Sequence, residues 1–426
     1  MTSDHVMPIH PRGPIHAAVR PPGSKSITNR ALVCAALAAG PSVLQGALDS
    51  EDTRVMYDAL AALGIVLAWN RDRGQITVEG SAGAWPGQQA DLYVANSGTT
   101  MRFLAPMLAT GAGHYRLDGT PRMRARPIGD LLRALRQLGA TVDSEAHNEC
   151  PPVTIAGRGL PGGTATIRGD ISSQFLSGLL LAAPYAQRRV ELLLDGPLVS
   201  QPYVHMTRHV MQAFGVHVED HALQRFVVDA PGRYQGREYS IEPDASAASY
   251  FWAAAAITGG RVTVIGLGPQ ALQGDVAFCD CLEHMGCHVQ READQITVTG
   301  KPLHGISVDM NHISDTVQTL AAVALFATGP TLITGVAHIR HKETDRIGDL
   351  ARELRKLGAA VDELPDGLRI EPGPLRGARI ATYQDHRMAM SLALVGLQVQ
   401  GVLIEDPYCT EKTYPGFFAD LESLRH

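Results

Sequence analysis

The chain has 426 residues, enough for two or three domains and a large buried core. Apolar residues make up 45% of it and charged residues 19%, which is typical of a folded, water-soluble protein and excludes a disordered or collagen-like chain. The net charge of -6 excludes bulk attraction to nucleic acid or to an anionic membrane, so that local clusters of cations must hold any anionic ligand.

No targeting or membrane-spanning segment is expected. The most apolar stretches, residues 176–186 and 251–257, are shorter than the roughly 18 residues that a membrane helix needs. Residues 1–13 lack the apolar core of a signal peptide. The six cysteines are scattered without metal-ligand spacing, and His205 and His209 have no evident third partner. We therefore expect a cytoplasmic protein with reduced thiols and no metal.

A first recurring pattern predicts an amphipathic helix that ends at a glycine and turns sharply into a strand. It occurs five times, as MYDALAALGIVLAW, DLLRALRQLGATVD, HVMQAFGVHVED, FCDCLEHMGCHVQRE and DLARELRKLGAAVDE. The junction glycines recur every 71 to 76 residues, at Gly64, Gly139, Gly215, Gly286 and Gly358. Two short strands that meet at a turn are expected after these helices, for example 360–363 and 368–371. The period is about one sixth of the chain, which indicates a repeat protein.

A second recurring helix lies between these elements and is apolar nearly all round, which indicates burial on most faces. Its six copies start near Ser26, Gly98, Ser172, Asp244, His312 and Asp385. One repeat could not cover its own apolar face, so the sequence predicts an α/β fold with two domains of three repeats each. Domain I is expected over residues 1–22 and 241–426, and domain II over 23–240, with the chain crossing near Pro21-Pro22 and within 229–238.

The first turns of these helices carry more than capping residues. A helix start offers free N–H groups and a partial positive charge, so several starts directed at one cleft would bind anions. Further cations lie at Arg124, Arg126, Lys342, Arg346 and Lys412. At an effective dielectric near 20, a cation about 4 Å from a phosphate contributes about 4 kcal/mol before desolvation. We therefore expect a phosphorylated substrate. The first turns of the six apolar helices have the sequences GSKS with Asn29 and Arg30, NSGTT with Arg102, SSQ, Asp244 with Ser246, HISD and DHR.

Several segments together resemble the 5-enolpyruvylshikimate-3-phosphate synthase (EPSP synthase) family of enolpyruvyl transferases. They are PPGSKSITNRALVCAALA, NSGTTMRFL, RMRARPIGDLL, ISSQFLSGLL, HKETDRIGDLARELRKLGA, YQDHRMAMSLAL and EKTYPGF, in order over nearly the whole chain. The resemblance implies a two-domain, inside-out α/β fold with six βαβαββ repeats, three per domain. It implies buried parallel helices, outer sheets and an active site in the cleft between the domains.

The resemblance also implies a reaction in the shikimate pathway of aromatic amino acid biosynthesis. Members transfer the enolpyruvyl group of phosphoenolpyruvate to the 5-hydroxyl of shikimate 3-phosphate through a tetrahedral intermediate and release phosphate. They use no metal or organic cofactor. By the match, Asp315 and Lys25 lie near the 5-hydroxyl, and Glu343 carries the proton at the methylene carbon. We expect a monomer with these two small-molecule substrates and neither nucleic acid nor membrane as a partner.

The match assigns two overlapping sets of binding residues. Phosphoenolpyruvate would be held by Lys25, Gly98, Arg126, Gln174, Arg346, Arg387 and Lys412. Shikimate 3-phosphate would be held by Lys25, Ser26, Arg30, Ser172, Ser173, Gln174, Ser200, Tyr203, Asp315, His338 and Lys342.

The chain departs from the family pattern at four positions. His338 stands where an Asn is common, which puts one contact to the substrate ring in question. Ser97 and Thr100 replace alanines, and Phe103 replaces a proline. Because Gly98 is retained beside the enolpyruvate position, we expect sensitivity to glyphosate, a mimic of phosphoenolpyruvate.

Two alternatives remain open at this point. The sister transferase that acts on UDP-N-acetylglucosamine is typified by a reactive cysteine five residues before the Arg-Pro dipeptide, but Pro121 occupies that position and Cys150 lies well beyond the loop. A two-domain anion-binding protein without catalysis would explain the cations and helix starts. It would have no need for Asp315 and Glu343, because carboxylates weaken anion binding.

Overall fold

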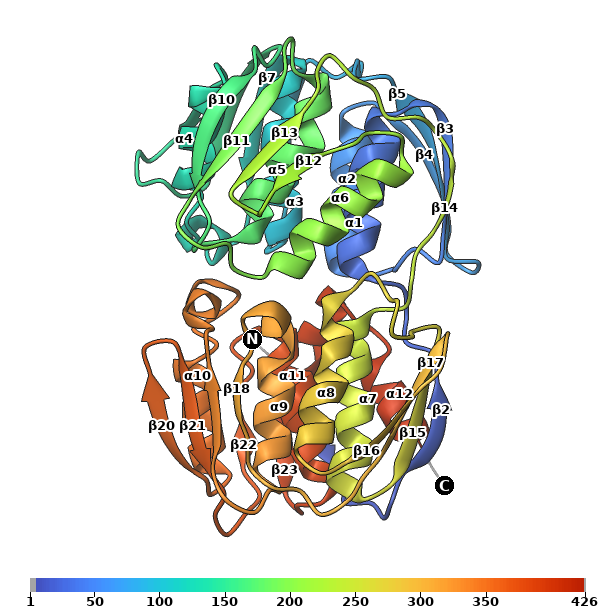
Figure 1. The fold of residues 1–426 in the computed structure, drawn as a ribbon, viewed down its shortest axis with the longest axis vertical. Helices are drawn as coiled ribbons and strands as arrows, with labels where there is room; N and C mark the ends of the chain where they lie inside the picture. Colours follow the sequence, from blue (N-terminus) through green and yellow to red (C-terminus); the bar gives the residue numbers. More distant parts are fainter. Residues whose placement is uncertain (1–4, 425–426) are drawn as a thin grey trace. The chain divides into compact units, whose positions relative to one another are not determined.

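The computed structural model describes residues 5–424, and the chain forms two compact units. Unit 1 comprises Met1–Pro22 and Glu242–His426, and unit 2 comprises Gly23–Ile241. Both are built from repeats in the order strand, helix, strand, helix, strand, strand (Figure 1). Within residues 5–424, no helix has the length and apolar character needed to cross a membrane.

Unit 2 contains three complete repeats. The first comprises β14 (Glu238–Ser240), α1 (Lys25–Leu37), β3 (Ala39–Gln45), α2 (Glu51–Ala62), β4 (Val66–Asn70) and β5 (Gln75–Ser81). The second comprises β6 (Gln89–Tyr93), α3 (Gly98–Thr110), β7 (Ala112–Asp118), α4 (Gly129–Gln137), β8 (Thr141–Ser144) and β9 (Val153–Arg158). The third comprises β10 (Gly163–Arg168), α5 (Ser173–Ala182), β11 (Val190–Asp195), α6 (Gln201–Ala213), β12 (Glu219–His221) and β13 (Arg225–Val228).

Unit 1 contains two complete repeats and a shorter one. The first comprises β2 (His16–Val19), α7 (Ala245–Thr258), β15 (Arg261–Ile265), α8 (Phe278–His284), β16 (His288–Arg291) and β17 (Gln295–Thr299). The second comprises β18 (Ser307–Asp309), α9 (Val317–Ala324), β19 (Thr331–Thr334), α10 (Gly348–Lys356), β20 (Ala360–Leu364) and β21 (Gly367–Glu371). The last comprises β22 (Arg379–Ile380), α11 (His386–Ala393), β23 (Val402–Glu405), α12 (Phe417–Ser423) and the N-terminal strand β1 (Val6–Ile9).

Each sheet begins with a parallel pair of strands and continues antiparallel. In the sheet β6-β7-β9-β8, for example, Leu92 of β6 pairs with Leu117 of β7 in parallel, and β9 pairs antiparallel with both β7 and β8. Strands β14 and β2 lie far along the sequence from the repeats that they complete. β14 pairs in parallel with β3, and β2 pairs in parallel with β15.

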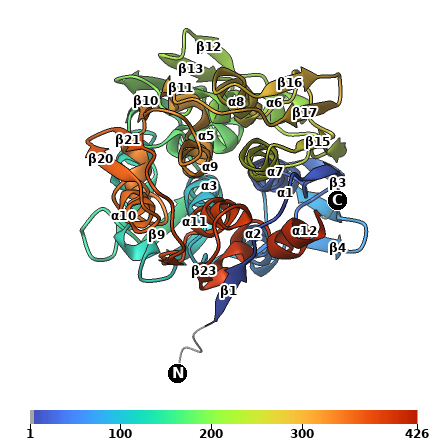
Figure 2. The same ribbon diagram turned by 90° about the horizontal axis from the view of Figure 1, so that it is seen from below.

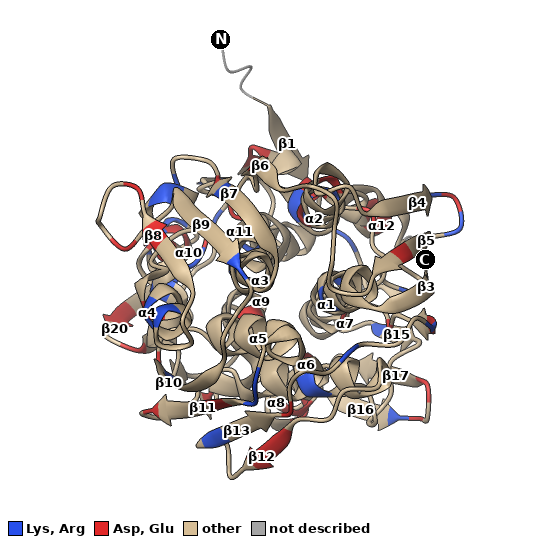
Figure 3. Cartoon of the chain, turned by 90° about the horizontal axis from the view of Figure 1, so that it is seen from above, with Lys and Arg blue, Asp and Glu red and all other residues tan. Residues whose placement is uncertain are grey.

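The apolar helices form the centre of each unit. All residues of α3 and of α7 are buried. In unit 1, α7, α9 and α11 lie inside, with the sheets around them (Figure 2). In unit 2, charged residues colour outer elements such as α4, β12 and β13 (Figure 3), while Arg30 of α1 and Arg102 of α3 are buried. Helix α5 approaches α3 so closely that a Cβ atom on Gly178 would lie 2.2 Å from the carbonyl oxygen of Arg102. The interior is therefore made of helices, as an inside-out fold requires.

The five junction glycines have the predicted conformation. Their φ angles lie between +83° and +111°, in the left-handed region that side chains disfavour. One expected helix start differs: α9 begins at Val317, because residues 311–316 first form the 3-10 helix η4 (Asn311–Thr316). The side chain of Asn311 donates to the carbonyl oxygen of Gly335 and so holds this extra turn against the end of β19.

We predict that Gly358→Ala destabilises the protein more than Gly259→Ala. Both residues have positive φ, but a Cβ atom on Gly358 would lie 2.3 Å from the Pro374 carbonyl oxygen, whereas a Cβ atom on Gly259 meets nothing within 4 Å. Gly259→Ala should cost about 1 kcal/mol of unfolding free energy and Gly358→Ala more than about 2 kcal/mol. Urea unfolding measures both. Equal losses would contradict the steric reading.

Candidate active site

Asp315 is the centre of a largely buried cluster of charges in unit 1. Its carboxylate accepts hydrogen bonds from Lys342 at 2.5 Å, from Arg387 at 2.8 Å and from Arg346 at 3.3 Å. Burial alone would raise the pKa of Asp315, but Arg387, Lys342 and Arg346 together hold that pKa well below its ordinary value. Burial lowers the pKa of Lys342 from its usual 10.5, and this effect exceeds the opposing effect of Asp315. The carboxylate is therefore ionised and already charge-compensated.

Arg346 lies among three carboxylates and is only 1% exposed. Its Nε and Nη2 atoms form a fork onto Asp385, at 2.6 and 3.1 Å. Nη2 also lies 2.9 Å from Glu343, and Nη1 donates to Asp315. Lys412 Nζ lies 3.9 Å from the other oxygen of Glu343. Such forked pairs fix a guanidinium in one plane. Glu343 is thus held between two cations, and the fork orients Arg346.

Arg387 reaches Asp315 from the first turn of α11. Asp385 is the N-cap residue of this helix, and its side chain accepts the Arg387 backbone N–H at 2.9 Å. Arg387 Nη1 donates to the Tyr250 hydroxyl at 3.3 Å. Asp385 therefore serves both a helix cap and an ion pair, and sequence reasoning had singled out the Asp385-His386-Arg387 start without giving this carboxylate a role in the site.

His338, in the 3-10 helix η5 (Ala337–His341), is buried next to this cluster. Burial, reinforced by the charge of Lys342, lowers the pKa of His338 to about 3. The imidazole is therefore neutral near pH 7 and has one N–H to donate, as an Asn side chain also could. The departure from the family pattern thus preserves a neutral donor at this position.

Asp275 is a further buried carboxyl group that sequence reasoning missed. It accepts a short hydrogen bond from Ser246. Burial, and then the negative charge of Asp315, raise the pKa of Asp275 to about 6. Ser246 stands out in the sequence at the start of α7, but nothing in the sequence links it to a residue 29 positions later.

Gly98 marks a second cluster, in unit 2. A Cβ atom there would lie 2.3 Å from Arg102 Nη1 and 2.6 Å from Arg126 Nη2, so glycine lets the two guanidinium groups converge. Arg102 donates to the side-chain oxygen of Gln174 at 3.1 Å, and Arg126 donates to Asn96. Gly98, Arg126 and Gln174 are thus brought together. Arg102 joins them, although no substrate contact had been assigned to it.

The two substituted positions before and after Gly98 form the cap of α3. The Ser97 hydroxyl accepts the backbone N–H of Thr100, and the two hydroxyl oxygens lie 2.8 Å apart. Phe103 is fully buried, and the guanidinium carbon of Arg30 lies 5.1 Å from the centre of its ring. These departures from the family pattern therefore fit the local structure.

Arg30 and Lys25 project from α1 of the same unit. Arg30 donates to the Thr207 hydroxyl at 2.7 Å and to the backbone oxygens of Ser26 and Tyr203 at 2.9 and 3.1 Å. Burial lowers the pKa of Arg30 to about 10. Lys25 Nζ lies 3.3 Å from the buried Asp52.

The remaining predicted residues of unit 2 lie at the starts of two other helices. Ser172 is the N-cap of α5 and accepts the backbone N–H of Gln174, and Ser173 is buried beside it. Ser200 precedes α6 with a left-handed φ of 51°, and Tyr203 lies in the first turn of that helix. In unit 2, the contacts therefore join Gly98, Arg126 and Gln174 through Arg102, and they join Arg30 to Ser26 and Tyr203.

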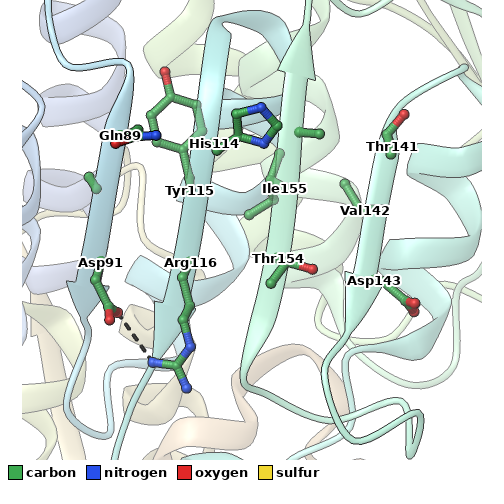
Figure 4. A pocket seen from close by; sticks show the side chains of 12 residues that line it. Gln89, Asp91, His114, Tyr115, Arg116, Thr141, Val142, Asp143, Thr154 and Ile155 are labelled. Carbon is green, nitrogen blue, oxygen red and sulfur yellow. Dashed lines mark hydrogen bonds and ion pairs between the residues drawn. The ribbon is translucent and has the colours of Figure 1, made fainter.

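A separate hollow of about 680 Å³ lies on the sheet β6-β7-β9-β8 of unit 2. Its lining includes Gln89, His114, Arg116 and Thr154 (Figure 4). Arg116 pairs with Asp91 at 3.2 Å. None of the predicted site residues lines this hollow, so it is not part of either cluster.

We predict that His338 makes the protein less stable in mild acid. Because its folded pKa of about 3 is below the unfolded value of about 6.5, the unfolded chain binds an extra proton between these values, and stability falls as the pH drops below 6.5. Between pH 7 and pH 5 this site should cost about 2 kcal/mol. His338→Asn should remove that loss in urea unfolding, and His114→Asn, at an exposed position, should not. An unchanged loss in His338→Asn would contradict the assignment.

Comparisons with known proteins place the chain in a family. The sequence model of EPSP synthase (3-phosphoshikimate 1-carboxyvinyltransferase) matches residues 9–421. A 3-phosphoshikimate 1-carboxyvinyltransferase of Nostoc punctiforme is 51% identical over 95% of both chains, and one of Cronobacter sakazakii is 45% identical over 98% of both. The solved EPSP synthase of Acinetobacter baumannii superposes with a TM-score of 0.83 at 27% identity, covering 98% of both chains. The chain therefore belongs to the EPSP synthase family.

Proposed function

We propose that the chain is a 3-phosphoshikimate 1-carboxyvinyltransferase, which joins the enolpyruvyl group of phosphoenolpyruvate to the 5-hydroxyl of shikimate 3-phosphate and releases phosphate. The family match over residues 9–421 carries this proposal. It favours this reaction over transfer to UDP-N-acetylglucosamine and over anion binding without catalysis. The reaction belongs to the shikimate pathway of aromatic amino acid biosynthesis.

The reaction has two steps with opposite proton movements. In the addition, the 5-hydroxyl oxygen bonds to C2 of phosphoenolpyruvate, a base takes the hydroxyl proton, and an acid gives a proton to the methylene carbon C3. In the elimination, C3 loses a proton, the double bond forms again, and the bond between C2 and the phosphate oxygen breaks. Each step therefore needs a group that can donate and one that can accept.

Asp315 is the proposed partner of the 5-hydroxyl, with Lys25 from unit 2. In the structure Asp315 is a weak base, because Lys342, Arg346 and Arg387 all donate to it. An anionic substrate that drew these cations onto its own phosphate or carboxylate would weaken their hold and raise the pKa of Asp315. Substrate binding would thus activate the base.

Glu343 is the proposed carrier of the proton at C3. Its carboxylate lies 2.9 Å from Arg346 Nη2 and 3.9 Å from Lys412 Nζ. Arg346 and Lys412 also belong to the set proposed for phosphoenolpyruvate. The same two cations would therefore bind both Glu343 and the substrate anion. This sharing would place Glu343 next to the reacting end of phosphoenolpyruvate.

We propose that the clusters of both units act on one pair of substrates. The set for phosphoenolpyruvate comprises Lys25, Gly98, Arg126, Gln174, Arg346, Arg387 and Lys412. The set for shikimate 3-phosphate comprises Lys25, Ser26, Arg30, Ser172, Ser173, Gln174, Ser200, Tyr203, Asp315, His338 and Lys342. Buried cations and serine hydroxyls at helix starts support these sets, since both stabilise phosphate.

We infer that the protein works in the cytoplasm. All six cysteines are free, as is usual in a reducing compartment. The monomeric state stays a prediction.

We predict that Glu343→Gln spares substrate binding and lowers kcat by about 100-fold or more, because the amide cannot carry the proton. Steady-state release of phosphate from phosphoenolpyruvate and shikimate 3-phosphate measures kcat and KM. Glu283→Gln, at an exposed ion pair with Arg291, is the control and should retain activity. A near-normal kcat in Glu343→Gln would overturn its role, and no phosphate release by the unaltered protein would overturn the reaction.

We predict inhibition by glyphosate in competition with phosphoenolpyruvate, because Gly98 and the converging Arg126 leave the site of the enolpyruvate anion intact. Gly98→Ala would push a methyl group against Arg102 and Arg126 and should weaken the binding of both molecules. Phosphate-release rates at several concentrations of phosphoenolpyruvate measure the competition. Unchanged turnover at millimolar glyphosate would contradict the prediction.

A further inference from the structure

Helix α10 carries one carboxylate on its buried side. The helix is otherwise amphipathic, with Leu350, Ala351 and Leu354 buried, yet Glu353 beside them is also completely buried. A buried carboxylate is costly unless several donors satisfy it. The contacts of Glu353 therefore indicate why it is there.

Three donors satisfy this carboxylate. One oxygen accepts the Tyr383 hydroxyl at 2.6 Å. The other accepts Lys356 Nζ at 2.7 Å and the backbone N–H of Ala381 at 3.1 Å. Burial, and then the hydrogen bond to Glu353, raise the pKa of Tyr383 to about 12, so the hydroxyl keeps its proton and donates it. Glu353 is thus tied at two points to the segment 381–383.

That segment leads into an unusual turn. Tyr383 and Gln384 have φ angles of 55° and 56°, two successive left-handed residues that are not glycine. Such a conformation persists where contacts from the surroundings hold it. The bonds from Glu353 to Ala381 and Tyr383 are such contacts, and the Tyr383 ring also lies 5.7 Å from the guanidinium carbon of Arg352.

Asp385 follows this turn directly. Its carboxylate forms the fork onto Arg346 and caps the helix that starts with Arg387. Arg346 in turn lies two residues before the start of α10, the helix that carries Glu353. Glu353 therefore ties the segment before Asp385 to the helix after Arg346.

We propose that Glu353 is a positioning residue, which acts through the Tyr383-Gln384 turn to hold Asp385 where its fork orients Arg346. It touches no substrate. Its effect on the reaction passes through the guanidinium proposed to bind phosphoenolpyruvate, so the inference rests on the proposed function of Arg346.

Glu353→Gln tests the proposal, because the amide has one acceptor oxygen instead of two and carries no charge, so Tyr383, Lys356 and Ala381 can no longer all donate to a carboxylate. We expect KM for phosphoenolpyruvate to rise by about tenfold, as for the loss of a hydrogen bond to a charged group, with a smaller change in KM for shikimate 3-phosphate. An unchanged KM for phosphoenolpyruvate in folded Glu353→Gln overturns the proposal. Glu371→Gln, at an exposed carboxylate paired with Arg369, is the matched control and should behave as the unaltered protein.

A double-substitution cycle separates positioning from a general loss of structure. In a background with Arg346→Lys, Glu353→Gln should raise KM for phosphoenolpyruvate less than about twofold, because the group that it positions has already been altered. If Glu353→Gln raises KM for phosphoenolpyruvate by the same factor with and without Arg346→Lys, the proposal is overturned. If Arg346→Lys alone leaves KM unchanged, the assignment of Arg346 fails instead.

Tyr383→Phe provides a second variant should Glu353→Gln not fold. It removes one donor to Glu353 and keeps the ring against Arg352. We expect a smaller rise in the same KM, which should also disappear when Arg346 is replaced. If Glu353→Gln does not fold and Tyr383→Phe leaves KM for phosphoenolpyruvate unchanged, the proposal is overturned. Far-UV circular dichroism and urea unfolding establish that each variant is folded.

Discussion

The mutual neutralisation of buried charges is the constraint on which the site in unit 1 depends. Asp315 accepts from three cations, and Arg346 lies among three carboxylates. Removing one partner would leave the remaining charges of this largely buried cluster less well compensated. The cluster therefore keeps its geometry as a unit, and under the proposed function an anionic substrate would take over some of these pairings.

The fold brings such charges together at the ends of helices, while the helix bodies stay apolar. Residues that start the buried helices, such as Asp385 and Ser172, cap the backbone and at the same time lie beside side chains that we propose to bind substrate. Small residues within the helix bodies allow this arrangement. Gly178, for instance, lets α5 lie against the backbone of α3, from which Arg102 reaches Gln174.

Much of this organisation could be predicted from the sequence, because local patterns determine it. The junction glycines, the two kinds of helix and the repeat order follow from periodicity and turn chemistry, and the helix starts identified the residues near Gly98 and Asp385. The contacts that depend on long-range packing could not be predicted. Asp275 with Ser246, and Glu353 with Tyr383, join residues about 30 positions apart whose approach only the folded chain reveals. The start of α9 was also misplaced, since a 3-10 turn and an α-helical turn share the same sequence signals.

The pairing of β1 with β23 has a consequence for how the protein is made. β1 is synthesised long before its partner strand, which belongs to the last repeat. β2 is likewise synthesised long before its partner β15. All strands of unit 2, in contrast, come from one continuous stretch of chain. During synthesis, unit 2 can close on itself while the N-terminal strands still have open edges, which are prone to pair with other chains. The edges of β1 and β2 are therefore open to aggregation during synthesis, whereas in the folded protein β23 and β15 cover them.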